Sequence, residues 1–163
     1  TPDMNLVEMD KNRKEGIAYL RANAAEAEEA LFREVELVDS PDRRLGGIIH
    51  LMGQFETKKS VTYLFSIAHS PLTGGCPSEE EEGCPEAYIL RQSAVESLGQ
   101  ISAAGGTIAR ARLLDLVSNE EPGVQRMAIK RFYDTSGMLR WRAKREMAKR
   151  LPVSQRYLLH AVH

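Results

Sequence analysis

The stretch at residues 86–117, EAYILRQSAVESLGQISAAGGTIARARLLDLV, constrains the fold most strongly. Apolar residues recur at helical spacing in its first half, at Leu90, Ala94, Val95, Leu98 and Ile101. Gly105 and Gly106 then interrupt the pattern, because paired glycines destabilise a helix interior and favour a reversal of the chain. The pattern resumes at Ile108, Ala111, Leu113, Leu114 and Val117. The stretch therefore predicts an antiparallel pair of helices.

The segments on either side predict further helices. We expect them at about 9–25, 24–38, 43–55, 60–68, 124–133 and 138–151, with a short last one around Tyr157. Residues 1–6 show no periodicity and are predicted to form an arm. No segment alternates with a period of two over a useful length, so the predicted class is all-α. The 163 residues fit one domain, residues 1–163, with about four helix pairs and a real core.

The last long helix has a clear predicted geometry. Ser136 is placed to cap it at its start, and Pro152 follows its end. Apolar residues recur every four positions and are expected to form its buried stripe: Leu139, Ala143, Met147 and Leu151.

The segment SPLTGGCPSEEEEGCPE, residues 70–86, interrupts the helical pattern. Its three prolines, three glycines and four consecutive glutamates do not suit a packed helix, so an inserted loop is predicted at about 70–85. Cys76 and Cys84, the only two cysteines, lie here in two Gly-Cys-Pro sequences. Our leading hypothesis is a disulfide between them, which would stabilise the loop locally by about 2–3 kcal/mol.

Two free thiols and a metal site are the alternatives for Cys76 and Cys84. The metal site is not favoured, because tetrahedral zinc needs four nitrogen or sulfur ligands and only His69 is near in sequence. A disulfide would place the protein in an oxidising compartment, the periplasm or the extracellular space. A cytoplasmic location is the alternative.

The helical segments align with one another as repeats. Setting Gly53 on Gly99 matches GIIHLMGQF with AVESLGQI at an offset of 46 residues. Setting Ala94 on Ala128 gives an offset of 34 and places Leu98 on Phe132. The two offsets differ by 12 residues, which is close to the size of the inserted loop. One helix pair cannot bury its apolar stripe alone, so stacked neighbours would complete the core.

These residues resemble HEAT repeats, most closely the short bacterial kind found in bilin lyases and related scaffolds. The similarity lies in a turn with acidic residues or proline, an Arg, and an apolar helix ending in Leu-Gly. It is carried by SPDRRLGGIIHLMGQF, EAYILRQSAVESLGQI and EPGVQRMAIKRFY, and it covers about residues 40–151. The resemblance implies a short α-solenoid of stacked antiparallel helix pairs.

Charge is distributed unevenly along the chain. Ten of the 22 Lys and Arg but only two of the 23 acidic residues follow position 123, so residues 124–163 carry about +8 and residues 1–123 about −9. The candidate binding surface is therefore basic, with one tryptophan, and comprises Arg126, Lys130, Arg131, Arg140, Trp141, Arg142, Lys144, Arg145 and Lys149.

Three interpretations of this basic surface remain open. It is a solvated face or an ion-pair network between repeats with Trp141 partly buried, a site for an acidic protein, or a site for nucleic acid. In the last case the cations would bind phosphates, as in a HEAT-like DNA glycosylase family, and Trp141 would stack on a base.

No catalytic constellation stands out, and neither a cofactor nor a metal is predicted. The preferred function is a non-enzymatic scaffold that binds another protein, in particular an acidic one, through its curved surface. The alternative is a HEAT-like enzyme of the bilin-lyase or DNA-glycosylase type, or nucleic-acid binding through the basic C-terminal helices. No run of about 18 apolar residues exists, so no membrane span is predicted.

Overall fold

Helices account for all regular secondary structure in residues 2–37, 43–70 and 86–162, the parts of the chain that the computed structural model describes. The elements are α1 (Pro2–Ala22), α2 (Ala24–Glu36), α3 (Arg43–Met52), α4 (Lys58–His69), α5 (Glu86–Ala103), α6 (Thr107–Leu116), α7 (Pro122–Thr135), α8 (Arg140–Arg150) and the 3-10 helix η1 (Val153–His160). The predicted all-α class is confirmed for these residues. The predicted loop at 70–85, with Cys76 and Cys84, lies almost wholly outside them.

Two helix starts show how the sequence sets the boundaries. Thr57 precedes α4, and its hydroxyl accepts a hydrogen bond of 3.1 Å from the backbone N–H of Ser60. Glu121 precedes α7, and its carboxylate accepts from the N–H groups of Gly123 and Val124 at 2.9 and 2.6 Å. These side chains satisfy N–H groups that have no partner within the helix, and Pro122 supplies a fixed φ at the first position.

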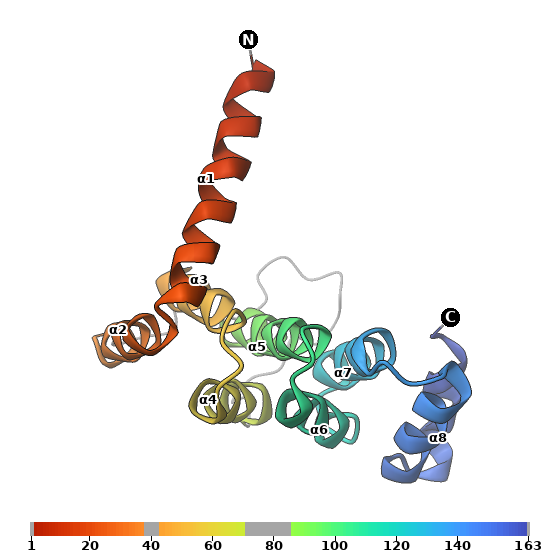
Figure 1. Ribbon diagram of the computed structural model, residues 1–163. Coiled ribbons are helices and arrows are strands. Elements are labelled where there is room, and N and C mark those ends of the chain that lie inside the picture. The colour runs from red at the N-terminus through yellow and green to blue at the C-terminus, as the bar shows by residue number, and fades with distance from the viewer. Residues whose placement is uncertain (1, 38–42, 71–85, 163) are drawn as a thin grey trace.

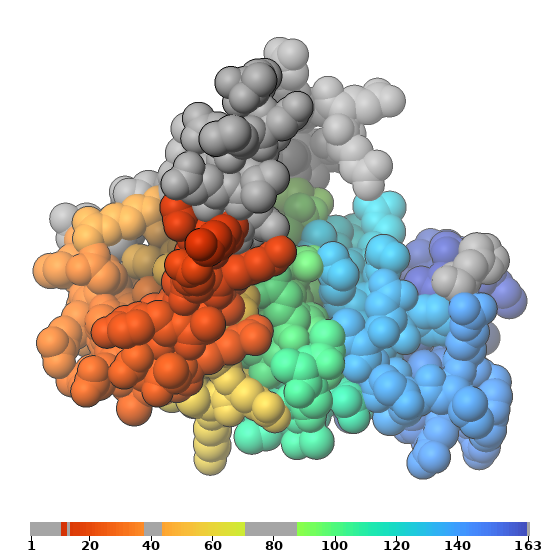
Figure 2. Space-filling model, turned by 45° about the horizontal axis from the view of Figure 1, so that its top comes forward, coloured from red at the N-terminus to blue at the C-terminus, as the bar shows by residue number. Residues whose placement is uncertain are grey.

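The helices from α3 onward lie in two rows (Figure 1). In one row α5 packs between α3 and α7; in the other α6 contacts α4 and α8. Each helix of one row also contacts the helix that follows it in the chain. Chain order therefore runs from one side of the molecule to the other, as the space-filling view also shows (Figure 2). The helix α2 lies at one side and α8 at the other, while α1 projects away from both rows (Figure 1).

The core lies between the two rows. The residues predicted for the stripe of α5, namely Leu90, Ala94, Val95, Leu98 and Ile101, are all buried. The corresponding residues of α7 are also buried: Val124, Ala128, Ile129 and Phe132. These two helices contact each other along their length, so each stripe completes the apolar surroundings of the other.

Close contacts between neighbouring helices recur at equivalent positions of the aligned segments. A Cβ added to Gly53 after α3 would lie 3.0 Å from Cβ of Ser97 on α5. A Cβ added to Gly99 on α5 would lie 3.0 Å from Cδ and 3.4 Å from Cβ of Arg131 on α7. Gly53 aligns with Gly99 at the offset of 46, and Ser97 with Arg131 at the offset of 34. Glycine at these positions lets one helix approach the next closely.

A buried arginine joins the two rows. Arg91 on α5 is only 4% exposed. Its Nε donates to the carbonyl of Ala68 at 3.0 Å, and its Nη2 donates to Oδ1 of Asn119 at 3.2 Å. Burial lowers the pKa of Arg91, while the carboxylate of Glu121 acts in the opposite direction. Arg91 thereby connects the end of α4 with the turn between α6 and α7.

Several local predictions were wrong. Helix α1 begins at Pro2, so residues 2–6 are helical and not an arm. These residues show no apolar periodicity, so the pattern that identifies the other helices is missing there. In α6, Ile108 and Ala111 are exposed, because that helix turns Ala109, Leu113 and Leu116 inward.

The start of the last long helix was also predicted wrongly. Leu139 precedes α8 with extended dihedrals and is 67% exposed, so it does not belong to the buried stripe of Ala143, Met147 and Leu151. Ser136 does not cap α8. Its hydroxyl accepts a hydrogen bond of 3.3 Å from the N–H of Met138, within the preceding turn.

Candidate binding surface

The nine residues of the predicted basic surface lie on α7 and α8, which pack against each other. Arg126 and Lys130 are exposed on α7, whereas Arg131 is partly buried because it crosses Gly99 of α5. On α8 the exposed members are Arg140, Trp141, Arg142, Arg145 and Lys149, and Lys144 is partly buried. The structure therefore brings these residues onto two adjacent helices, but it does not leave all of them open to a ligand.

Some of the cations form ion pairs within the protein. Arg131 binds Glu96 of α5 at 2.5 Å, which ties α7 to α5. Lys130 binds Asp134 at 3.1 Å, one helical turn further along α7. Lys149 binds Glu146 at 2.7 Å in the same way on α8. The hypothesis of an ion-pair network between repeats therefore fits Arg131, whereas the other two pairs are local and exposed, a kind worth about 0.3–0.5 kcal/mol.

Two further contacts attach α8 to its neighbours. The Lys144 ammonium lies 5.6 Å from the centre of the Tyr133 ring of α7, in a cation–π contact. Arg150 binds Asp115 of α6 at 3.2 Å, and Arg112 approaches the same carboxylate at 3.4 Å. Sequence spacing gave no signal for the pair Arg150–Asp115, because its members lie on different helices. These contacts position α8 and hold its remaining side chains outward.

The α8 outer face, by which we mean Trp141, Arg142, Arg145 and Lys149, points away from the buried Ala143 and Met147. Trp141, Arg145 and Lys149 recur every four positions, and Arg142 precedes Arg145 by three, so the four residues form one continuous strip. Trp141 is 61% exposed, so its side chain is accessible to a partner at this face. The side chains of Arg142 and Arg145 form no hydrogen bond or ion pair with the described residues.

The positive field of this face acts on Glu146, which lies beside it. The hydrogen bond from Lys149 lowers the pKa of the Glu146 carboxyl, and the charges of Lys149, Arg142 and Arg145 lower it further. Desolvation opposes this shift but does not outweigh it. The face therefore stabilises a nearby carboxylate of this protein, which is the chemical group that an acidic partner would present.

Exposed apolar side chains border the basic residues. Leu139 lies just before α8, and η1, which packs on α8, exposes Val153 and Tyr157. These three side chains and Trp141 are each at least 61% exposed. The C-terminal end of the molecule thus combines guanidinium groups with large apolar side chains, a composition typical of protein–protein contacts.

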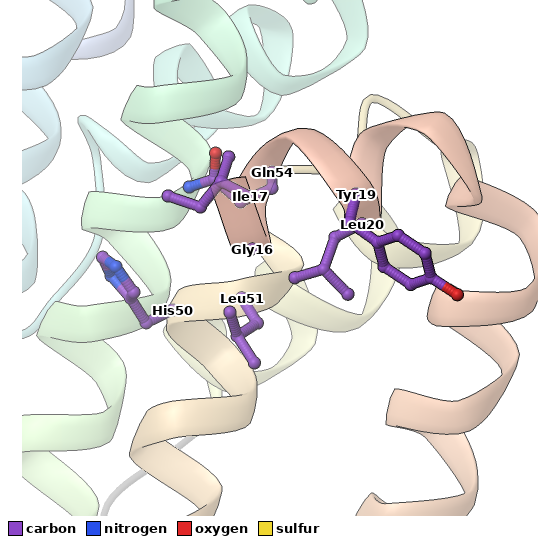
Figure 3. A pocket seen from close by; sticks show the side chains of 7 residues that line it. All are labelled: Gly16, Ile17, Tyr19, Leu20, His50, Leu51 and Gln54. Carbon is purple, nitrogen blue, oxygen red and sulfur yellow. The ribbon is translucent and has the colours of Figure 1, made fainter. Parts of the chain in front are cut away.

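A mostly apolar pocket of about 420 Å³ lies between α1 and α3. Its lining comes from the base of α1 and from α3 and the residues just after it: Gly16, Ile17, Tyr19, Leu20, His50, Leu51 and Gln54. Figure 3 shows Leu20 and Leu51 in the middle, with Tyr19 and His50 on opposite sides. Sequence analysis missed this pocket, because it depends on how α1 crosses α3. The sequence signal for a contact there was the apolar character of Ile17 and Leu20, and both side chains are partly buried.

A second, shallower hollow of about 580 Å³ lies along α4, at Lys58, Lys59, Thr62, Tyr63 and Ser66. Lys59 covers the Phe32 ring at 4.0 Å, and burial raises the pKa of Tyr63. Neither hollow includes a residue of the predicted basic surface.

Two further features concern the described residues alone. No three of their His, Cys, Asp or Glu side chains are grouped so that they would hold a metal ion. No helix among them combines the length and the apolar character needed to cross a lipid bilayer.

Comparison with models of protein families, with curated proteins and with solved structures found no match to this chain.

Proposed function

We propose that this protein is a short HEAT-like α-solenoid that works as a non-enzymatic scaffold and binds an acidic protein through α7 and α8. The fold part of this proposal is supported by the two rows of helices and by the equivalent contacts of Gly53 with Ser97 and of Gly99 with Arg131. A stack of this kind offers a continuous surface to a partner, because each helix pair contacts only its neighbours.

The observation that carries the binding part is the α8 outer face. The side chains of Arg142 and Arg145 are exposed and form no direct ion pair with a carboxylate of the described residues, and they stand beside the exposed ring of Trp141. Arginine binds carboxylates through two parallel N–H groups, and tryptophan and arginine are the residues most enriched among the strongest contacts of protein interfaces. An acidic segment with an apolar side chain would satisfy both kinds of group.

A protein partner is favoured over nucleic acid by the surroundings of this face. Leu139, just before α8, and Val153 and Tyr157, on η1 that packs on α8, offer apolar area, which protein partners bury and a phosphate backbone does not. Asp134 and Glu146 also reduce the positive charge of α7 and α8 by pairing with Lys130 and Lys149. Single-stranded nucleic acid is the second candidate, because Trp141 between cations suits the stacking of a base.

The proposal is tested by affinity capture with three baits, which are the native chain and two matched variants. The first variant carries Arg142→Glu and Arg145→Glu. The control carries Lys11→Glu on α1 and Lys58→Glu on α4, so it changes the net charge of the protein by the same amount. We expect the first variant to lose proteins that the native and control baits retain, and expect those proteins to bind the purified native chain again. Retention of the same proteins by all baits would contradict the proposal. Loss of nucleic acid instead of protein would replace it by the second candidate.

A further inference from the structure

We infer that the α8 outer face of one molecule binds the exposed acidic face of α2 on a second copy of this chain, so that copies associate head to tail. This inference rests on the proposed function, since it names one acidic partner for the same basic face. The α2 outer face consists of Glu26, Glu29, Arg33 and Glu36, which are exposed and lie opposite the buried Leu31.

The two faces carry opposite charge. The α2 outer face has a formal charge of −2, because Arg33 binds Glu29 at 2.6 Å and offsets one of its three carboxylates. The α8 outer face has a formal charge of +3, and Glu146 offsets one of these charges by binding Lys149 at 2.7 Å. The side chains of Glu26, Arg142 and Arg145 form no hydrogen bond or ion pair with the described residues. Each face therefore keeps a net charge after its own ion pairs are counted, and such complementarity steers and orients association.

The two faces also match in shape and in apolar content. Both are strips along helices of similar length, 13 residues in α2 and 11 in α8, so they suit helix-to-helix packing. Each is bordered by exposed apolar side chains, with Leu37 at the end of α2 and Trp141 and Leu139 at the start of α8. Burial of these side chains would add to the ionic contacts a contribution that salt does not screen.

The positions of α2 and α8 determine what kind of assembly would form. They lie on opposite sides of the molecule, with the helix rows between them (Figure 1). A contact from α8 of one copy to α2 of the next is heterologous, and it leaves one free α2 face and one free α8 face at the ends. Association is therefore expected to continue with concentration beyond a dimer and to weaken with salt.

The test uses two variants that reverse one face each, studied alone and mixed. Variant one carries Glu26→Lys and Glu36→Lys; variant two carries Arg142→Glu and Arg145→Glu. Glu29 is left unchanged because it pairs with Arg33. The average mass is measured by sedimentation over a concentration series at about 50 mM and about 500 mM salt. Circular dichroism of each variant shows whether its helices are retained.

The native chain is expected to exceed its monomer mass of 18.2 kDa at low salt and to approach it at high salt. Each variant alone is expected to stay at the monomer mass, since its two faces then carry charge of the same sign. The mixture is expected to associate again, because each variant supplies the face that the other lacks. A third variant with Lys11→Glu and Lys58→Glu, on neither face, should associate like the native chain.

Two results would overturn the inference. One is a native chain that remains monomeric at every concentration and salt. The other is an association that both variants retain alone, because it would not use these faces. If self-association fails while the Arg142 and Arg145 bait still loses acidic proteins, the proposed function stands and only the second copy is wrong as the occupant. If the bait also loses nothing, the α8 outer face is a solvated surface and both proposals fail.

Discussion

Gly99 of α5 lies directly against the side chain of Arg131 of α7, so that a Cβ at Gly99 would lie 3.0 Å from Cδ and 3.2 Å from Cγ of Arg131. Arg131 crosses this position to reach Glu96, one turn earlier on α5, at 2.5 Å. The same arginine that seemed from sequence to belong to a ligand-binding surface is therefore a contact between neighbouring helices. Its role follows from a small residue 32 positions earlier in the chain.

A large side chain at Gly99 should separate α5 from α7. We expect Gly99→Leu to lower the free energy of unfolding by about 1–3 kcal/mol, because Arg131 Cβ and Cγ cannot move as far as the end of that side chain can. Gly47→Leu is the matched control. Gly47 lies exposed on α3 with nothing near a Cβ, so helix propensity should raise stability there by up to about 1 kcal/mol. Urea unfolding measures both, and equal effects would contradict the close approach.

Arg91 provides the second stability prediction. Lysine cannot reproduce both hydrogen bonds, to the carbonyl of Ala68 and to Oδ1 of Asn119, because its ammonium is not a planar fork. Arg91→Lys should therefore lower the free energy of unfolding by about 1.5–3 kcal/mol. Arg110→Lys on α6 is the control, since the buried Nε of Arg110 has no hydrogen-bond partner among the described residues. That change should stay within about 0.5 kcal/mol. A smaller loss at Arg91 than at Arg110 would show that the two rows do not depend on Arg91.

The long helices with a buried stripe could be predicted from the sequence, because burial imposes a regular apolar spacing on them. In α5 and α7 each stripe is buried by neighbours on both sides, so period 3.6 persists over the whole helix and identifies Leu98 and Phe132 correctly. The same argument failed at Leu139, because the chain there is extended and the spacing of four no longer refers to one helix. It also failed for residues 2–6, which belong to α1 although their sequence has no apolar period of 3.6.

The candidate site was predictable in composition but not in detail. The excess of Lys and Arg after residue 123 located the candidate surface on α7 and α8. The predicted set of residues included Arg142, Arg145 and Trp141. The sequence does not show which cations contact other residues of the protein, because the contacting residues lie on other helices or other turns. Examples are Glu96, which binds Arg131, and Tyr133, which contacts Lys144. The acidic residues of α2 form a Glu-rich segment in the sequence. Its relation to the α8 outer face emerged only once both were located at opposite sides of the molecule.

The pKa of Glu146 reports the field of the α8 outer face. Lys149→Met should raise this pKa toward its ordinary value, and it should do so more than Arg142→Met, because the hydrogen bond from Lys149 is the largest cause of the shift. A carboxyl with a lowered pKa stabilises the fold above its unfolded pKa, and this contribution is lost as pH falls through the folded value. Carbon-detected NMR titration of the Glu146 carboxyl measures each variant. A larger shift for Arg142→Met would mean that Lys149 does not hold the carboxylate in solution.

The disulfide between Cys76 and Cys84 remains a prediction, since both residues lie outside the described parts of the chain. We propose that the pair is oxidised and that the protein is therefore periplasmic or secreted. The helix rows make their contacts through α3 to α8, so replacing both cysteines by serine should leave the helices folded. The loss of stability should be no more than about 2–3 kcal/mol, because a disulfide in a short segment constrains a small loop. Intact mass after alkylation, with and without reductant, counts the thiols in protein taken directly from its native compartment. Two alkylated thiols without reductant would rule out the disulfide, and the extracytoplasmic location would then lose the one feature that supports it.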